Sequence, residues 1–176
     1  MNLLSRGEIL EALEALAREL GPVRPAVEII VGGGAALVLL YEARSSTKDV
    51  DALAFIGSDP AVIRQAARRV AALLNLPEDW LNDSAKGYLH GLLPGEILLE
   101  KPSLIVRAVA PQQLLAMKLC AWRDDIDIAD ATLLLSKLSG EKEEVWRLAE
   151  PYLIPGRELK ARYAFEDLWE LERGTP

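Results

Sequence analysis

The spacing of apolar and polar positions changes several times along the first half of the chain. In residues 5–20 the apolar side chains form one stripe at helical spacing, and Ser5 and Glu8 stand at the positions of a capping box. Because Gly21 and Pro22 follow, this segment predicts a helix that ends before Gly21. The patterns of the next segments predict strands at 26–31 and 49–56, and helices at 35–43 and from Ser58 or Asp59 to about Leu74.

The second half of the chain predicts two further strands and then helices only. Residues 76–96 have no regular pattern and predict mostly loop with one short helix. Strands are expected at 96–100 and 103–110, and helices at 112–122, 125–138, 141–149 and 157–172. The order predicts an α+β fold in which a core with an N-terminal helix spans residues 1–110 and a C-terminal helical extension, residues 111–176, packs on that core.

The composition is that of a compact folded protein with an excess of acidic residues. Hydrophobic residues make up 51% and charged residues 27% of the 176 residues, and the mean hydropathy is +0.12. The net charge of −7 argues against a general electrostatic grip on nucleic acid, which uses a basic face. Residues 101–123 differ from this balance, because they carry four cations and no acid, and this segment could face an anion.

Three further features predict a cytoplasmic protein with no membrane partner. Cys120 is the single cysteine, so the chain can form neither an intramolecular disulfide nor a cysteine metal cluster. The N-terminal segment has neither the basic start nor the continuous apolar run of a signal peptide. The longest apolar run, residues 35–41, is too short to span a bilayer.

The first candidate for chemistry is the glycine run Gly32, Gly33 and Gly34, between a predicted strand and a predicted helix. Glycine lets the backbone approach a phosphate closely, and the first N–H groups of a helix lie at the positive end of its dipole. Glycines at a strand-to-helix turn are also common in proteins without any ligand. The run therefore needs support from other residues.

That support comes from two carboxylates in the next predicted strand. Asp49 and Asp51 project to the same face of a strand and can bind one Mg²⁺ or Mn²⁺ ion together. A solvated strand edge is the alternative, but the two acids continue a row with Leu53 and Phe55, where charges are unusual unless a cation meets them. Arg44, Thr47 and Lys48 precede the acids and could steer a phosphate, although such loop residues are often only solvated.

These motifs resemble a known family. A hydrophobic strand that ends in Gly-Gly, followed by a helix and "RSSTKDVDAL", is similar to the signature of the polymerase-β-type nucleotidyltransferases. The segments "PEDWLND" and "APQQLLAMKLCAWRDDIDIADATLLL" resemble a bacterial branch of that fold related to the AbiEii toxins of toxin–antitoxin and phage-defence systems. The resemblance spans roughly residues 26–138.

The resemblance implies a minimal nucleotidyltransferase fold, a small mixed sheet flanked by helices. It also implies that the glycine run holds the triphosphate of a nucleoside triphosphate (NTP) and that Asp49 and Asp51 bind Mg²⁺. In the toxin-related branch a lysine on a later helix and an acid beyond it complete the site, and Lys118 and Asp127 match these positions. Asp124 and Asp130 compete with Asp127 for the acid. Without the resemblance, Lys118 reads equally well as a lysine that extends from an apolar helix to solvent.

One departure from the family bears on activity. Many members carry a third carboxylate on a neighbouring strand, where residues 103–110 offer Arg107 and no acid. Glu100 or Asp127 would have to fill that role, with Glu100 as a further metal ligand.

The residues, together with the resemblance, imply two possible functions. The first is a Mg²⁺-dependent transfer of a nucleoside monophosphate from an NTP to an RNA hydroxyl, such as a tRNA 3′ end, or to a protein hydroxyl, in a system with a cognate antitoxin. The alternative is a catalytically inactive module of the same fold that binds nucleotide or a protein partner.

Overall fold

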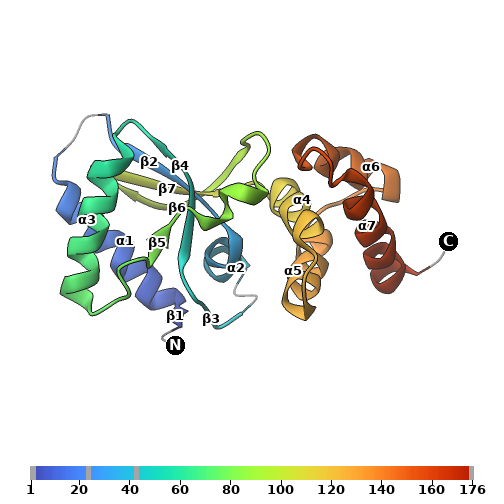
Figure 1. The fold of residues 1–176 in the computed structure, drawn as a ribbon, viewed down its shortest axis with the longest axis horizontal. Coiled ribbons are helices and arrows are strands. Elements are labelled where there is room, and N and C mark those ends of the chain that lie inside the picture. Colours follow the sequence, from blue (N-terminus) through green and yellow to red (C-terminus); the bar gives the residue numbers. More distant parts are fainter. Residues whose placement is uncertain (1–2, 23–24, 42–43, 175–176) are drawn as a thin grey trace. The chain divides into compact units, whose positions relative to one another are not determined.

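The computed structural model describes residues 3–22, 25–41 and 44–174 of the chain (Figure 1). The chain forms two compact units. The first unit comprises Met1–Lys86 and Pro94–Val109, and the second comprises Gly87–Leu93 and Ala110–Pro176. Among the described residues, none of the helices has the length and apolar character needed to cross a bilayer.

The first unit is built around a mixed five-stranded sheet with the order β5-β4-β2-β7-β6. Strand β2 pairs in parallel with β7 and antiparallel with β4, β5 is parallel to β4, and β6 is antiparallel to β7. The predicted α+β class is therefore confirmed. The elements of this unit are β1 (Leu4–Ser5), α1 (Arg6–Leu20), β2 (Val27–Gly32), α2 (Gly33–Tyr41), β3 (Ser46–Thr47), β4 (Val50–Ile56), α3 (Pro60–Leu74), β5 (Leu81–Asn82), β6 (Pro94–Lys101) and β7 (Leu104–Val109), with the 3₁₀ helix η1 (Ser84–Tyr88) at the unit boundary.

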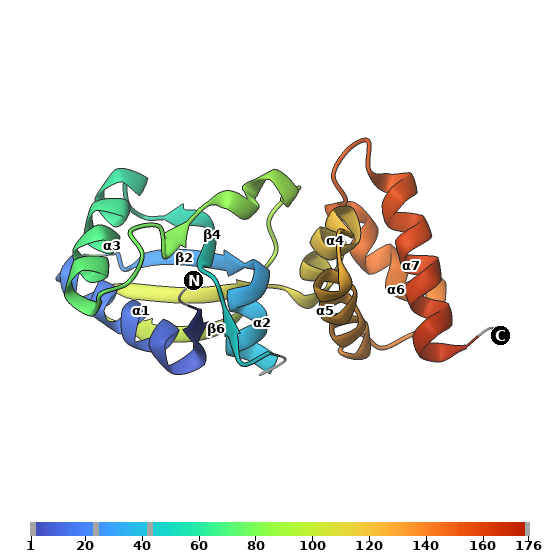
Figure 2. The same cartoon turned by 60° about the horizontal axis from the view of Figure 1, so that its bottom comes forward.

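One face of this sheet carries the hydrophobic core. Helices α1 and α3 lie next to each other on it (Figure 2). Their apolar stripes pack on alternate residues of the strands, such as Ile29 and Val31 of β2 and Val50 and Ala52 of β4, all with exposed fractions of 0%. Because side chains alternate along a strand, Asp51 lies on the opposite face of the sheet.

The alternation predicted for residues 49–56 holds only as far as Ala52. Val31 pairs with Ala52 and Ile30 pairs with Ala54, so Leu53 is an extra residue in β4. Such a bulge reverses the side-chain alternation beyond it. Phe55 consequently packs against the core of α1 and α3. The prediction that Phe55 shares the face of the two aspartates was wrong, because sequence spacing does not reveal a bulge.

Most element boundaries follow the prediction, with local differences. Helix α1 starts after Ser5 with the predicted capping box, in which the Ser5 and Glu8 side chains each accept a bond from the other's backbone N–H. Helix α2 begins at Gly33 rather than at residue 35, and its predicted end at residue 43 lies outside the described residues. The two-residue strands β1, β3 and β5 were not predicted, because strands this short have no periodicity.

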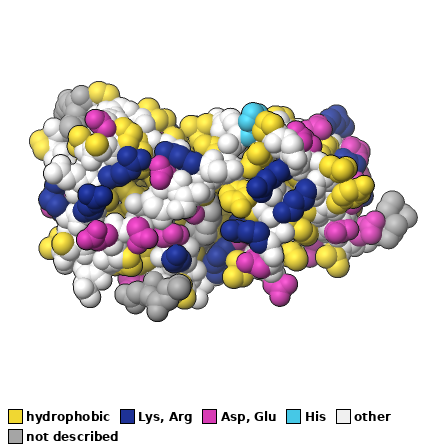
Figure 3. All heavy atoms as spheres, in the orientation of Figure 1, with side chains coloured by type: hydrophobic (Ala, Val, Ile, Leu, Met, Phe, Trp, Pro, Cys, Tyr) yellow, Lys and Arg dark blue, Asp and Glu magenta, His cyan; other side chains and the backbone are white. Residues whose placement is uncertain are grey.

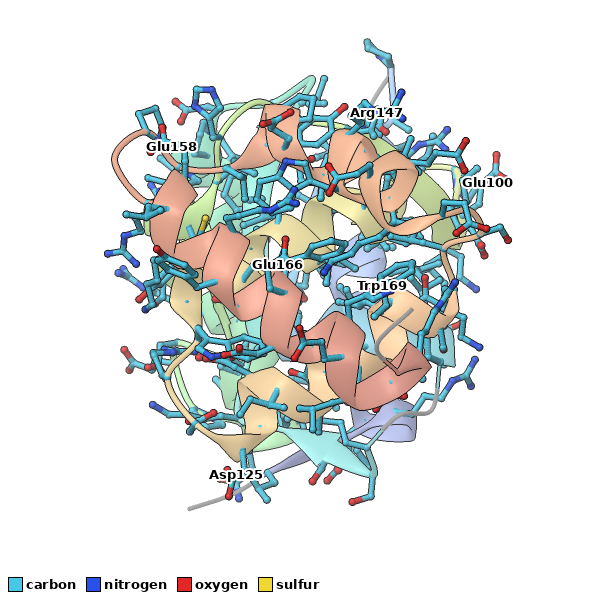
Figure 4. All side chains as sticks on the ribbon, turned by 90° about the vertical axis from the view of Figure 1, so that its right-hand side faces the viewer. Glu100, Asp125, Arg147, Glu158, Glu166 and Trp169 are labelled. Atoms are coloured by element: carbon cyan, nitrogen blue, oxygen red, sulfur yellow. The ribbon has the colours of Figure 1, made fainter. Side chains whose placement is uncertain are left out.

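The second unit is helical, as predicted for most of the C-terminal part of the chain. Its aromatic side chains Trp146, Phe165 and Trp169 form a row with ring centroids 5.3 and 5.7 Å apart. Figure 4 shows Trp169 and Glu166 on the helix that faces the viewer. The elements are α4 (Pro111–Ala121), α5 (Asp125–Ser136), α6 (Lys142–Ala149), the 3₁₀ helix η2 (Glu150–Tyr152) and α7 (Glu158–Arg173).

The segment 87–93 belongs to this helical unit because of one buried side chain. Gln113 on α4 has an exposed fraction of 0%. Its amide oxygen accepts the N–H of Leu93 at 2.6 Å, and its amide nitrogen donates to the carbonyls of His90 and Gly91. All three bonds hold residues 87–93 against the start of α4 within the second unit.

Trp80 ties β5 to the first unit. Its side chain is fully buried, and its indole N–H donates to the carbonyl of Ala67 in α3 at 3.0 Å. Its own carbonyl accepts the N–H of Val50 at 2.7 Å. The indole thus anchors the short strand that lies beside the two aspartates.

The Trp80→Ala substitution should lower the free energy of unfolding by about 3–5 kcal/mol, because it leaves a cavity in a packed core. Leu73→Ala, on the exposed side of α3, should change it by less than about 0.5 kcal/mol. Denaturant unfolding followed by circular dichroism measures both. Similar losses in the two variants would contradict the anchoring role of Trp80.

Candidate active site

The glycine run and the segment 44–53 lie in direct contact. A Cβ atom placed on Gly33 would overlap Oδ2 of Asp51, and one on Gly34 would lie 2.5 Å from Oγ1 of Thr47. Gly33 also has a φ of +58°, which favours glycine. Glycine is therefore favoured in this turn by the positive φ of Gly33 and by the close approach of Asp51 in β4, the aspartate strand, and of Thr47 in β3. The contact with Gly33 brings Asp51 to the first turn of α2.

One cation also reaches this turn. Nη1 of Arg44 lies 3.3 Å from the position that a Cβ of Gly34 would occupy. The N-terminus of α2 therefore combines the positive end of a helix dipole with a guanidinium group, and both favour a phosphate. The Thr47 side chain, with an exposed fraction of 7%, is buried beneath Gly34, so its hydroxyl packs against the backbone.

The two aspartates contact one loop, which the sequence had not identified as part of the site. The side-chain amide of Asn82 in β5 donates to Oδ2 of Asp49 at 2.9 Å. The backbone N–H of Ala85 in η1 donates to Oδ1 of Asp51 at 3.2 Å. Asn82 also pairs with Asp51 in the strand register. The only sequence signal for this segment is "PEDWLND", which resembles the family, but none of its residues was predicted to belong to the site.

The donor set of the site fits a Mg²⁺ ion that is shared with a substrate. Mg²⁺ is usually bound by one or two carboxylates, and phosphate oxygens and water complete its six ligands. Asp49 and Asp51 supply two carboxylates, and the described residues contain no group of three or more His, Cys, Asp or Glu side chains suited to a metal. The site would thus need the phosphates of a nucleotide to hold the ion.

The strand register removes Glu100 from the candidate ligands. Glu100 pairs with Ile105, which lies beside Glu28, whereas Asp51 pairs with Gly32. Glu28 and Gly32 are four residues apart on one strand, a separation of roughly 13 Å along the sheet. A metal ligand must lie within about 2–2.5 Å of the ion. Glu100 was a candidate because it is near in sequence to the third strand, but it lies at the opposite end of the sheet.

Arg107 in β7 has a partner within the sheet. Its Nε lies 2.8 Å from Oε1 of Glu28 on the neighbouring strand, and both side chains are partly exposed. Arg107 is thus held in a cross-strand ion pair, and β7 contains no carboxylate.

Lys118 and Asp127 lie together in the second unit. Nζ of Lys118 is 2.9 Å from Oδ1 of Asp127 and 2.7 Å from Oδ2 of Asp130, and only 12% of the lysine side chain is exposed. Lys118 therefore does not extend into solvent. Asp124 is the N-cap of α5, where its side chain accepts the N–H of Asp127.

The Asp127 carboxylate is the centre of this cluster. It also accepts bonds from the backbone N–H and the guanidinium of Arg123. Burial raises the pKa of Asp127, but the hydrogen bonds from Arg123 and Lys118 outweigh burial and lower it to about 2. The carboxylate is thus ionised at neutral pH and joins the end of α4 to the start of α5.

The candidate residues fall into two groups. Gly32, Gly33, Gly34, Arg44, Thr47, Asp49 and Asp51 belong to the first unit, and Lys118 and Asp127 belong to the second. The structure brings the members of each group together. That the two groups form one site stays a prediction.

Gly33→Ala should destabilise the first unit by more than about 1 kcal/mol, because the new methyl group meets Asp51 and the φ of Gly33 is positive. Gly7→Ala is a matched control in α1, where a Cβ meets nothing within 4 Å, and it should stabilise by about 0.4–1 kcal/mol. Thermal unfolding of both variants measures the difference. A stabilising Gly33→Ala would show that the turn tolerates a side chain.

The pKa of Asp127 predicts a loss of stability in acid. Its pKa is about 2 in the folded state against an ordinary value of 3.8, so the folded state binds fewer protons than the unfolded state. Its contribution, about 2 kcal/mol, should be present above pH 4 and lost as the pH falls from 4 to 2. The difference in unfolding free energy between the wild type and Asp127→Asn should shrink over this range in denaturant titrations. A difference that stays constant from pH 6 to pH 2 would contradict it.

Comparison with known proteins agrees with the motifs and the fold. Residues 8–142 match the model of a family described as "Nucleotidyltransferase of unknown function (DUF6036)". No curated protein and no solved structure matches the chain. The matched range includes the sheet, the glycine turn, Asp49 and Asp51, and the Lys118 and Asp127 pair. With its fold and more than half of its length in agreement with that family, the chain belongs to the nucleotidyltransferases of family DUF6036.

Proposed function

We propose that this protein is a Mg²⁺-dependent nucleotidyltransferase that transfers a nucleoside monophosphate from an NTP to a hydroxyl group. The observation that carries the proposal is the contact between the glycine turn and the aspartate strand. It places the carboxylate of Asp51 against Gly33 and the guanidinium of Arg44 near Gly34, both at the N-terminus of α2. A triphosphate with a divalent cation is the ligand that matches these charges.

In this reaction the acceptor hydroxyl oxygen forms a bond to the α-phosphorus of the NTP. The bond from the α-phosphorus to the oxygen that bridges to the β-phosphate breaks, pyrophosphate leaves, and the hydroxyl proton passes to solvent or a base. Asp49 and Asp51 would hold Mg²⁺ or Mn²⁺, which supplies positive charge to the attacking and leaving oxygens when bound. The N–H groups at the start of α2 and Arg44 would orient the triphosphate.

For Lys118 and Asp127 we propose different roles. The pKa of about 2 for Asp127 makes this carboxylate a poor general base at neutral pH. Asp127 would instead hold Lys118 in place. Two of the three N–H groups of the Lys118 ammonium face Asp127 and Asp130, and the third would serve a phosphate of the substrate.

The acceptor is proposed from the sequence resemblance to AbiEii-type toxins. That resemblance favours an RNA hydroxyl, such as a tRNA 3′ end, over a protein hydroxyl, and it predicts a cognate antitoxin as a partner. Cations and acids are interspersed on the face shown in Figure 3, in line with the net charge of −7. A defined RNA end suits such a surface better than long RNA bound by general electrostatic attraction.

Arg107 favours a second candidate function, in which the protein binds its ligand without catalysing a transfer. The strand next to β2 offers this ion-paired cation where many relatives have a carboxylate, and Glu100 lies at the other end of the sheet. A site with two carboxylates could bind a nucleotide without transferring it. The alternative is thus an inactive module that binds nucleotide or a protein partner.

The double substitution Asp49→Asn with Asp51→Asn should abolish Mg·NTP binding in calorimetry, because it removes both carboxylates and keeps their size. Glu11→Gln with Glu78→Gln is the matched control, since these exposed acids of the first unit change the net charge equally. The control should bind as the wild type does. Equal binding by the Asp49/Asp51 variant would refute the proposed site.

Incubation with labelled NTPs, Mg²⁺ or Mn²⁺ and total RNA separates the enzyme from the inactive module. The proposal expects label on RNA with the wild type and none with the Asp49/Asp51 variant. Binding of Mg·NTP without label on RNA or on protein would favour the module.

A further inference from the structure

Every polar group of the Asn82 side-chain amide forms a hydrogen bond beside the two aspartates. Its two amide N–H groups donate to Oδ2 of Asp49 at 2.9 Å and to the carbonyl of Asp79 at 3.1 Å. Its amide oxygen accepts the N–H of Ser84 at 2.8 Å. A rotated amide would place oxygen against two acceptors, so this orientation is the one that satisfies every group.

The bond to Ser84 extends the influence of Asn82 to the second aspartate. Ser84 is the first residue of η1, and the next N–H, of Ala85, donates to Oδ1 of Asp51. Asn82 therefore contacts one carboxylate directly and fixes the start of the 3₁₀ helix that contacts the other.

The position of Asn82 is itself set by packing. Trp80 and Leu81, which precede it, are buried with exposed fractions of 0% and 6%. Because β5 is parallel to β4 and pairs Asn82 with Asp51, the Asn82 side chain points to the same face of the sheet as the Asp51 side chain. A short strand held by a buried tryptophan thus presents a single amide to the site.

We propose that Asn82 is a positioning residue that holds Asp49 through its amide and Asp51 through the start of η1, so that both carboxylates are oriented before a metal ion arrives. Outer partners of metal ligands typically change metal affinity by about 10- to 100-fold when they are removed. The metal part of this inference rests on the proposed function, whereas the effect on η1 does not.

The test uses Asn82→Leu, which keeps the approximate size and removes all three bonds, and Asn82→Ala, which avoids a larger apolar group beside the carboxylates. Ser103→Ala is the matched control. The Ser103 hydroxyl donates one buried hydrogen bond to the carbonyl of Ala17 in α1, and Ser103 lies beside the start of β2, at the end of the sheet away from the aspartates. Two measurements are made on the full chain: amide hydrogen exchange at Ser84 and Ala85 without metal, and Mn²⁺ binding by electron paramagnetic resonance in the presence of a non-hydrolysable NTP, whose phosphates complete the ligands of the ion.

Exchange at Ser84 and Ala85 should become roughly tenfold faster in both Asn82 variants and stay unchanged in Ser103→Ala. Mn²⁺ affinity should fall by about 10- to 100-fold in the Asn82 variants alone. The role of Asn82 would be overturned if amide hydrogen exchange at Ser84 and Ala85 stayed unchanged in the Asn82 variants. It would also be overturned if the wild type bound Mn²⁺ and the Asn82 variants bound it with the same affinity. A wild type that binds no Mn²⁺ would overturn the metal site and the proposed function, and faster exchange would then still support the hold of Asn82 on η1.

Discussion

The structure of the candidate site depends on the close approach between the backbone of Gly32–Gly34 and the side chains of residues 44–53. Asp51, Leu53 and Thr47 each occupy the space where a Cβ would stand on one of the three glycines. This contact joins the end of β2 and the start of α2 to β4 and β3, because the three glycines have no side chains to keep these segments apart. The carboxylate, the guanidinium of Arg44 and the helix N-terminus meet for this reason.

Residues of β5 and the segment before it support this contact. The indole of Trp80 anchors β5 to α3, and Asn82, two residues later, contacts Asp49. The second unit uses a different device, a buried ion pair between Lys118 and Asp127 that also closes the turn from α4 to α5. A buried pair of this kind holds geometry more than it adds stability, because desolvation offsets much of the attraction. In each unit a candidate residue is held by a neighbouring side chain: Asn82 contacts Asp49 in the first unit, and Asp127 contacts Lys118 in the second.

The sequence predicted the elements with strong periodicity and the residues with unusual chemistry. Helix α1 was predicted with its cap because Ser5 and Glu8 interact locally, and the Asp49 and Asp51 pair was recognised from its spacing. The bulge at Leu53, which turns Phe55 toward the core, was not predictable, since it depends on how β4 pairs with β2. Glu100 was misplaced for the same reason, because the register between β6 and β7 sets which end of the sheet it occupies.

By itself, the sequence determined the fold class, the glycine turn, the two aspartates and the resemblance to nucleotidyltransferases. These depend on local spacing, on residue type and on motifs within short segments. Only the tertiary structure decided that Asn82 and Ala85 contact the aspartates, that Glu100 does not, and that Asp127 is an ionised partner of Lys118 and Arg123. These facts depend on strand register, on burial and on contacts between residues far apart in the chain, which local spacing and residue type do not reveal.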